Sequence, residues 1–149
     1  MAKPDEKYNV NDSFPMMMCT CVKYMKESLN KRFRDAGFNV TNEQWMVLVY
    51  LGQEDGISQQ VIADRYDRSK VSALNLILKL ETGGYVIRRV DPADRRSNLV
   101  HLTDKGRSLL NKLIPLAREN ITYMNRKISI EDMEVLKATV KKITENIKN

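Results

Sequence analysis

Cysteine is scarce in this chain. The 149 residues include two cysteines, Cys19 and Cys21. They lie two positions apart in a stretch with helical spacing, so their side chains point to different faces and no disulfide is expected between them. The chain therefore lacks the cysteine framework that holds small secreted domains together.

Long apolar runs are also missing. No stretch approaches the roughly 20 apolar residues that span a bilayer. The segment 1–12 is polar and lacks the apolar part of a signal peptide. We expect a flexible tail over 1–12, a single domain over 13–149, a cytoplasmic location and no membrane partner.

The sequence lacks the residue groups that usually support catalysis. His101 is the only histidine, and a single histidine on a predicted strand is more often a surface or packing residue than a base. No Gly-rich phosphate loop, metal-ligand cluster or Ser/His/Asp arrangement is found. We expect neither an enzyme nor a bound metal or cofactor.

What the chain does contain is an excess of positive charge. Lys and Arg total 25 against 19 Asp and Glu, which gives a formal net charge of +6, and 42% of the residues are hydrophobic. This composition supports a folded core. The charge favours a polyanionic partner such as nucleic acid, although many soluble proteins are basic for other reasons.

Residues that cap helices mark the starts of the first two predicted helices. Ser13, with Pro15 in the first turn, begins a helix that Gly37 ends. Thr41 and Gln44 have the spacing of a capping box, in which each side chain satisfies a free backbone N–H of the other. This box predicts the start of a second helix.

Two further helices follow in close succession. Ser58 caps a short helix that reaches Tyr66, and Ser69 caps a longer one after the tight polar stretch 67–69. Gly83 ends the longer helix. Its predicted apolar face consists of Ala73, Leu76, Ile77 and Leu80.

A β-hairpin is predicted after these helices. The segments 85–90 and 98–102 have strand composition, and the charged sequence DPADRR between them begins with an Asp-Pro turn. Arg88 and Arg89 lie along the first strand, and Arg95 and Arg96 lie at the tip. The hairpin therefore presents basic side chains.

Helices are also predicted at both ends of the domain. Thr103 begins a helix in which Pro115 is expected to produce a kink or a local interruption. The N-terminal and last helices carry apolar stripes that exceed the needs of a small core, so a partner helix is expected to cover them. The stripes consist of Met18, Val22, Met25, Leu29 and Phe33, and of Met133, Leu136, Val140, Ile143 and Ile147.

A short helix, a tight turn, a second helix and a basic hairpin together suit a reader of duplex DNA. An α-helix fits the major groove of B-DNA, and a narrow minor groove attracts inserted Arg. The residues that we expect to contact DNA are Ser69, Lys70, Ser72, Asn75, Lys79, Arg95 and Arg96. Leu74 and Leu78 lie on a face expected to be polar, where packing is favoured over contact with a thymine methyl.

The span from Thr41 to Arg107 resembles the MarR (multiple-antibiotic-resistance) family of regulators. The sequence TNEQWMVL (41–48) is similar to the family's second helix, and 57–86 to its helix-turn-helix through the motif LExxGxV. The family's wing motif D-x-R-x-x-x-V-x-L-T is met by Asp94, Arg96, Val100, Leu102 and Thr103, and DKGR (104–107) continues it.

This resemblance implies a winged-helix homodimer. The implied fold is mainly α with a small β-hairpin wing, with a winged helix-turn-helix over 41–102 between dimerisation helices over 13–36 and 103–149. It also implies that Asp94 and Arg96 form the ion pair that shapes the wing and that Arg95 enters the minor groove. At Leu74 and Asn75 the family often has Thr and Arg, which affects the expected base preference.

The resemblance further implies a regulator, acting as a repressor, that a small aromatic or phenolic effector releases from DNA. The expected effector pocket contains Met17, Met18, Tyr24, Met25 and Trp45, although residues of these types are more often ordinary core. Two alternatives stay open: a thiol-based redox sensor that uses Cys19 or Cys21, and a winged-helix module that binds protein instead of DNA.

Overall fold

A computed structural model describes residues 9–66 and 69–148. Its helices are η1 (a 3-10 helix, Val10–Asp12), α1 (Phe14–Asp35), α2 (Asn42–Gln53), α3 (Gln59–Arg65), α4 (Lys70–Thr82), α5 (Asp104–Met124) and α6 (Ile130–Lys148). Its strands are β1 (Ile57–Ser58), β2 (Val86–Val90) and β3 (Asn98–Leu102). The prediction of a mainly helical fold with a small β-wing is confirmed.

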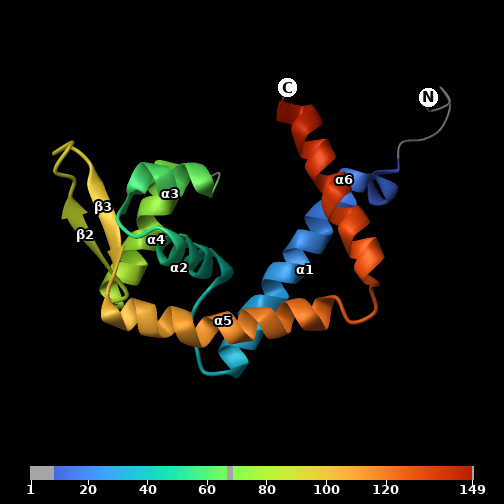
Figure 1. The fold of residues 1–149 in the computed structure, drawn as a ribbon, viewed down its shortest axis with the longest axis horizontal. Helices are drawn as coiled ribbons and strands as arrows, with labels where there is room; N and C mark the ends of the chain where they lie inside the picture. The colour runs from blue at the N-terminus through green and yellow to red at the C-terminus, as the bar shows by residue number, and fades with distance from the viewer. Residues whose placement is uncertain (1–8, 67–68, 149) are drawn as a thin grey trace.

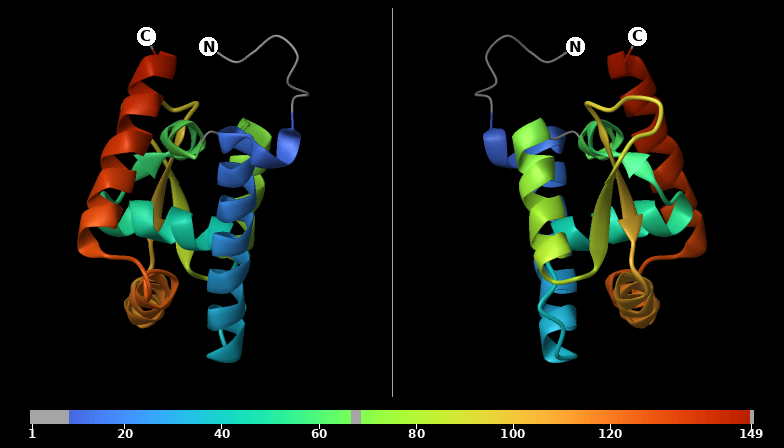
Figure 2. Two further views of the ribbon diagram at one scale, coloured as in Figure 1. Left: turned by 90° about the vertical axis from the view of Figure 1, so that its right-hand side faces the viewer. Right: turned by 90° about the vertical axis from the view of Figure 1, so that its left-hand side faces the viewer.

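The molecule has two parts that α5 joins. In Figure 1, α2, α3, α4 and the sheet form a lobe at one end of α5, and α1 and α6 lie toward its other end. The views of Figure 2 separate α6 from α1, which overlap in Figure 1. No helix among the described residues is long and apolar enough to cross a membrane.

The small sheet has one strand more than the predicted hairpin. Its order is β1-β3-β2, and both pairings are antiparallel, so β3 is the central strand. The extra strand pairs Ile57 with Val100, and the N–H of Gly56 donates to the carbonyl of Val100 over 3.0 Å. Gly56 has φ +71°, which a glycine adopts without strain. A two-residue strand is too short to produce a recognisable alternation.

The core lies inside the lobe and at the crossing of α1 with α5. Phe33 of α1 is fully buried and packs edge-on against Trp45 of α2, with ring centroids 5.7 Å apart. This contact attaches the C-terminal half of α1 to the lobe. The buried cluster also contains Leu29, Val47, Leu48, Leu51, Ile62, Ile77, Leu80, Val86, Val100, Leu110 and Leu113.

Capping behaves as predicted at the starts of α2, α3 and α4. Thr41 and Gln44 form the capping box, Ser58 accepts from the N–H of Val61, and Ser69 caps α4. Ser13 is the exception, because its hydroxyl donates to the carbonyl of Val10 instead of accepting from the helix.

The structure adds detail at two places, the segment before α1 and Pro115 within α5. Within the tail expected over 1–12, Val10–Asp12 form a 3-10 turn that the Asn9 side chain caps, and residues 1–8 lie outside the described part. Pro115 does not interrupt α5, which is one helix from Asp104 to Met124. Proline has no N–H to donate to the carbonyl of Asn111. Both Pro115 and Asn111 are exposed residues, so water can reach this side of α5.

Candidate nucleic-acid interface

The first turn of α4 is fixed by two serines. The Ser69 hydroxyl accepts from the backbone N–H of Ser72 over 3.2 Å and donates to the Ser72 hydroxyl over 3.0 Å. This mutual bonding holds both side chains against the start of the helix. The predicted turn residues 67 and 68, which precede it, lie outside the described part of the chain.

One face of α4 is anchored in the core, and the opposite face is open. Ala73, Ile77 and Leu80 are buried, which confirms the predicted apolar face, and Leu76 is half-buried. Of the predicted DNA contacts on α4, Ser69, Lys70, Asn75 and Lys79 are exposed and Ser72 is half-buried. A partner that approaches α4 can therefore reach these side chains at least in part.

Leu74 and Leu78 of α4 have different environments. Leu74 is half-buried, in keeping with the packing role predicted for it. Leu78 is 37% exposed, on the open side of the helix. Val71, which the sequence interpretation did not consider, is 69% exposed. Its spacing of four from Asn75 and two from Ala73 is the signal that could have placed it on the open face.

The wing tip is shaped by two aspartates that accept backbone hydrogen bonds. The Asp91 carboxylate accepts from the N–H of Ala93 over 2.8 Å, and the Asp94 carboxylate accepts from the N–H of Arg96 over 3.0 Å. The N–H of Ser97 then donates to the carbonyl of Asp94 over 2.9 Å. These are the contacts by which short acidic side chains stabilise turns.

The predicted pair of Asp94 and Arg96 is present, but its ionic part is weak. The Arg96 Nε lies 3.5 Å from the Asp94 Oδ1, and the Arg96 side chain is 94% exposed. An ion pair so open to water contributes little. Asp94 therefore shapes the wing mainly through the backbone N–H of Arg96.

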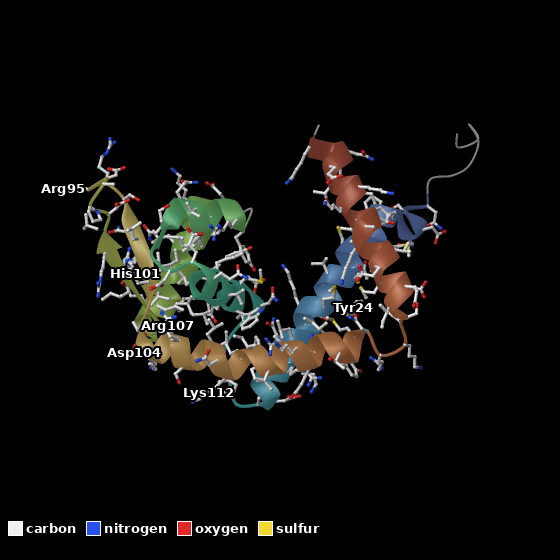
Figure 3. The ribbon with its side chains drawn as sticks, in the orientation of Figure 1. Tyr24, Arg95, His101, Asp104, Arg107 and Lys112 are labelled. Atoms are coloured by element: carbon white, nitrogen blue, oxygen red, sulfur yellow. The ribbon has the colours of Figure 1, made fainter. Side chains whose placement is uncertain are left out.

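Arg95 stands at the tip of the wing. Its exposed side chain projects from the turn between β2 and β3 (Figure 3), and it has no hydrogen bond or ion pair with the described residues. In Figure 2 the first turn of α4 and the wing tip lie toward the same end of the molecule. One surface can therefore present both elements to a single partner.

The wing is attached to α4 by Glu81. Its carboxylate accepts from the backbone N–H of Arg88 over 3.2 Å and from the Arg88 Nε over 3.0 Å. Arg88 was predicted as one of the basic residues of the wing, but it pairs with Glu81 within the protein. Arg89 is exposed. Sequence reasoning missed this contact because the partners belong to different elements.

Asp55 connects the lobe to α5. Its carboxylate accepts from the N–H of Leu102 over 2.8 Å and lies 3.6 Å from the His101 Nδ1 and 3.9 Å from an Arg107 nitrogen. The His101 ring packs against Gly56. His101 therefore has a structural position at the base of the wing.

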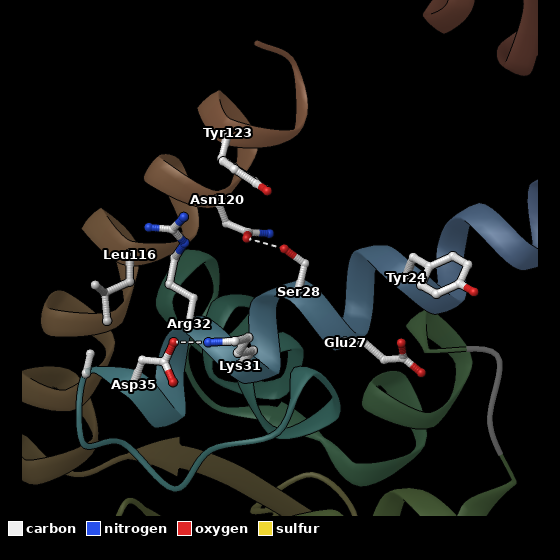
Figure 4. A pocket seen from close by; sticks show the side chains of 10 residues that line it. Tyr24, Glu27, Ser28, Lys31, Arg32, Asp35, Leu116, Asn120 and Tyr123 are labelled. Atoms are coloured by element: carbon white, nitrogen blue, oxygen red, sulfur yellow. Dashed lines mark hydrogen bonds and ion pairs between the residues drawn. The ribbon is translucent and has the colours of Figure 1, made fainter. Parts of the chain in front are cut away.

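The five residues predicted to form one effector pocket do not meet in one cavity of this chain. Tyr24 lines a cavity of about 750 Å³ between α1 and α5, where the Ser28 hydroxyl donates to the buried Asn120 side chain over 2.7 Å (Figure 4). Met17 and Tyr24 line a second hollow, on α1. Trp45 lines a third, between α2 and α5.

The start of α1 explains this separation. Only Leu29 and Phe33 of its predicted stripe are buried, whereas Val22 and Met25 are exposed and Met18 is half-buried. The first half of α1 thus extends away from the lobe that holds Trp45. Cys19 and Cys21 are exposed on this half, and the Cys21 thiol lies 3.8 Å from the Met25 sulfur.

Comparisons with known proteins agree with this geometry. The model of the MarR family matches residues 38–97. The uncharacterized HTH-type transcriptional regulator YkoM of Bacillus subtilis is 30% identical over 120 residues, which are 80% of this chain and 77% of YkoM.

Solved structures share the whole fold. MepR of S. aureus in complex with DNA has a TM-score of 0.81 at 26% identity and covers 90% of this chain and 98% of that chain. BpsR of Bordetella bronchiseptica has a TM-score of 0.84 at 19% identity and covers 93% of this chain and 98% of that chain, a likeness of fold alone. This chain therefore belongs to the MarR family of DNA-binding, winged helix-turn-helix transcriptional regulators.

Proposed function

We propose that this chain is a homodimeric repressor of transcription that reads a specific duplex sequence with α4 and the wing. The observation that carries the proposal is that Asn75 and Arg95 are both exposed on elements that extend toward the same end of the lobe. MepR, a relative of 26% identity, has been solved bound to DNA, which supports this use of the surface.

Each exposed residue has a chemically suited role. Asn75 pairs with an adenine edge in the major groove. Lys70 and Lys79 contact phosphates, and the free N–H groups that Ser69 leaves at the start of α4 favour a phosphate as well. Arg95 enters the minor groove beside the site.

Selection of bound duplexes from a random pool tests the function directly. The wild-type protein is expected to enrich one sequence, and Asn75→Ala is expected to change the preference at one position by about 1–3 kcal/mol. Asn111→Ala, an exposed asparagine on α5, serves as the matched control with unchanged preference. If the wild type, Asn75→Ala and Asn111→Ala all enriched the same sequence equally, the role of α4 in sequence recognition would be contradicted.

The terminal helices support the homodimer. None of the residues Ile130–Lys148 is buried by the described part of the chain, although Met133, Leu136 and Val140 align on one apolar face of α6. Exposed apolar residues also cover the first half of α1. We assign 13–36 and 103–149 to dimerisation and 41–102 to DNA binding, within one domain over 13–149, because a second copy can cover both faces.

The dimer is tested by changing one face of α6 at a time. Leu136→Asp places a charge on the apolar face and is expected to shift the mass in sedimentation from dimer to monomer. Ala138→Asp adds the same charge on the opposite, polar face and is expected to leave the dimer intact. A monomeric wild type, or equal behaviour of the two variants, would contradict this interface.

The groove that contains Trp45 is the proposed site of a small aromatic or phenolic effector. It has a volume of about 470 Å³ and combines the apolar Trp45, Val49 and Leu110 with Arg107 and Arg118. A few cationic groups around an apolar surface suit a ring with an acidic oxygen. BpsR has the same fold, and 6-hydroxynicotinic acid regulates its binding to DNA.

Trp45 also supplies the assay, because it is the only tryptophan. Binding of simple phenols and hydroxybenzoic acids is expected to change its fluorescence and to reduce DNA affinity, and Arg118→Ala is expected to weaken both effects. Arg34→Ala, at the end of α1, is the control. Release of DNA without any change at Trp45 would place the effector elsewhere.

A thiol-based redox sensor is the second candidate, because both cysteines are exposed and Cys21 contacts the Met25 sulfur. Mass spectrometry after mild peroxide treatment, with DNA affinity measured in parallel, tests it. Oxidation with loss of affinity that Cys21→Ser prevents would support the redox role. Unmodified thiols with unchanged affinity would remove it.

A further inference from the structure

The outermost line of α4 is more apolar than a reader of DNA phosphates requires. Val71, Asn75 and Leu78 are spaced four and three residues apart, so they share one line of the helix surface. This line is opposite the buried Ala73 and Ile77. Val71 is 69% exposed and Leu78 is 37% exposed, so the valine in the first turn is more open than the leucine further along the line.

Val71 is not placed to pack within the protein or at the proposed dimer interface. It lies in the first turn of α4, whereas α1 and α6 lie toward the other end of α5 (Figure 1). Covering Val71 therefore requires the partner that approaches α4 itself. Under the proposed function that partner is the major groove of DNA, and the inference below rests on that function.

We infer that Val71 is a specificity-determining residue that contacts the 5-methyl group of a thymine in each half-site. Its side chain ends in two methyl groups and has no hydrogen-bonding atom. Thymine is the base that presents a methyl group in the major groove, and apolar side chains recognise it there. Recognition helices contact bases with their N-terminal residues, where Val71 lies.

Helix geometry places this thymine close to the adenine that Asn75 reads. Four residues of α-helix advance by about 6 Å. Successive base pairs are separated by about 3.4 Å. The methyl group that Val71 contacts therefore lies within about two base-pair steps of the pair that Asn75 contacts, so each half-site contains A·T pairs at both positions.

Replacing thymine with deoxyuridine tests the inference, because this change removes the 5-methyl group alone. The duplex that the wild-type protein selects is synthesised with each half-site thymine replaced in turn, and affinity is measured by fluorescence anisotropy at fixed salt. The wild type is expected to lose about threefold to tenfold at one position near the Asn75 adenine. Val71→Ala is expected to bind the thymine duplex more weakly by a similar factor.

The decisive result is the coupling between the two changes. Val71→Ala is expected to show no further loss when that thymine becomes deoxyuridine. Leu78→Ala, further along the same line, and Val135→Ala, a valine on α6 that is 66% exposed, are expected to keep the wild-type response. Thermal melting checks that Val71→Ala folds like the wild type, as its exposure predicts.

Two results would overturn the inference alone: no thymine that responds to deoxyuridine, or the wild-type response retained by Val71→Ala. In both cases the selected sequence and its binding would leave the proposed function intact. Failure of the wild type to select any duplex would instead overturn the proposed function, and the role of Val71 with it.

Discussion

Glu81 in the last turn of α4 holds Arg88 of β2 by both its backbone and its side chain. The Glu81 carboxylate accepts from the Arg88 N–H over 3.2 Å and from its Nε over 3.0 Å. The two side chains are 31% and 28% exposed, so water screens the pair only in part. This contact fixes the direction of the wing relative to α4.

Removing the carboxylate should loosen the wing. Glu81→Ala is expected to lower the free energy of unfolding by about 1 kcal/mol, since the pair is partly screened. It is also expected to reduce DNA affinity while leaving the preferred sequence unchanged. Urea denaturation and anisotropy measure the two effects. Glu145→Ala, from an exposed pair on α6, should change neither, and equal effects of both variants would contradict the role of Glu81.

Asp94 offers a test that separates turn shaping from charge. Asp94→Asn keeps an oxygen that can accept from the Arg96 N–H, whereas Asp94→Ala does not. We expect Asn to retain most of the DNA affinity and Ala to lose several-fold, by about 0.5–1.5 kcal/mol. If Asn and Ala were equally weak, the ionic contact with Arg96 would be the important one.

Gly106 should not tolerate a side chain. It lies in the first turn of α5, where alanine normally stabilises a helix, but a Cβ there would clash with the backbone carbonyl oxygen of Tyr85. Gly106→Ala is expected to cost at least about 2 kcal/mol in urea denaturation. Gly37→Ala has open space but a φ of +86°, and is expected to cost about 1 kcal/mol. Equal stability of Gly106→Ala and the wild type would contradict the close packing of α5 on the hairpin.

Local signals in the sequence were sufficient for much of the fold. The capping box of Thr41 and Gln44, the caps Ser58 and Ser69, and the strands on either side of DPADRR depend on neighbours within a few residues. Such contacts are visible in sequence spacing. The apolar face of α4 followed from helical periodicity in the same way.

Contacts between distant segments could not be predicted in this way. The pairing of Ile57 with Val100 and the bond from Leu102 to Asp55 join residues more than forty positions apart. Helical periodicity predicts apolar stripes on α1 and α6, but it does not specify whether the same chain or a second copy covers them. Helical spacing could have placed Val71 on the open face of α4, but its exposed fraction depends on how distant segments pack around that helix.

Arg95 is expected to contribute charge more than sequence preference. Arg95→Ala should weaken binding to many duplexes and lower the slope of log affinity against log salt by about one for each Arg95 in the complex. Arg34→Ala removes the same charge from an exposed site near the end of α1 and should leave the slope unchanged. An unchanged slope for Arg95→Ala would remove the wing tip from DNA binding.

A hydroxyl-radical footprint of the wild-type protein on its selected duplex tests the central claim most directly. A symmetric pair of subunits, each with α4 in a major groove, predicts two protected patches related by two-fold symmetry, about one helical turn apart. Leu136→Asp should reduce or remove both patches together at the same protein concentration. A single unpaired patch, or no protection at concentrations that saturate binding, would contradict a dimeric reader of duplex DNA.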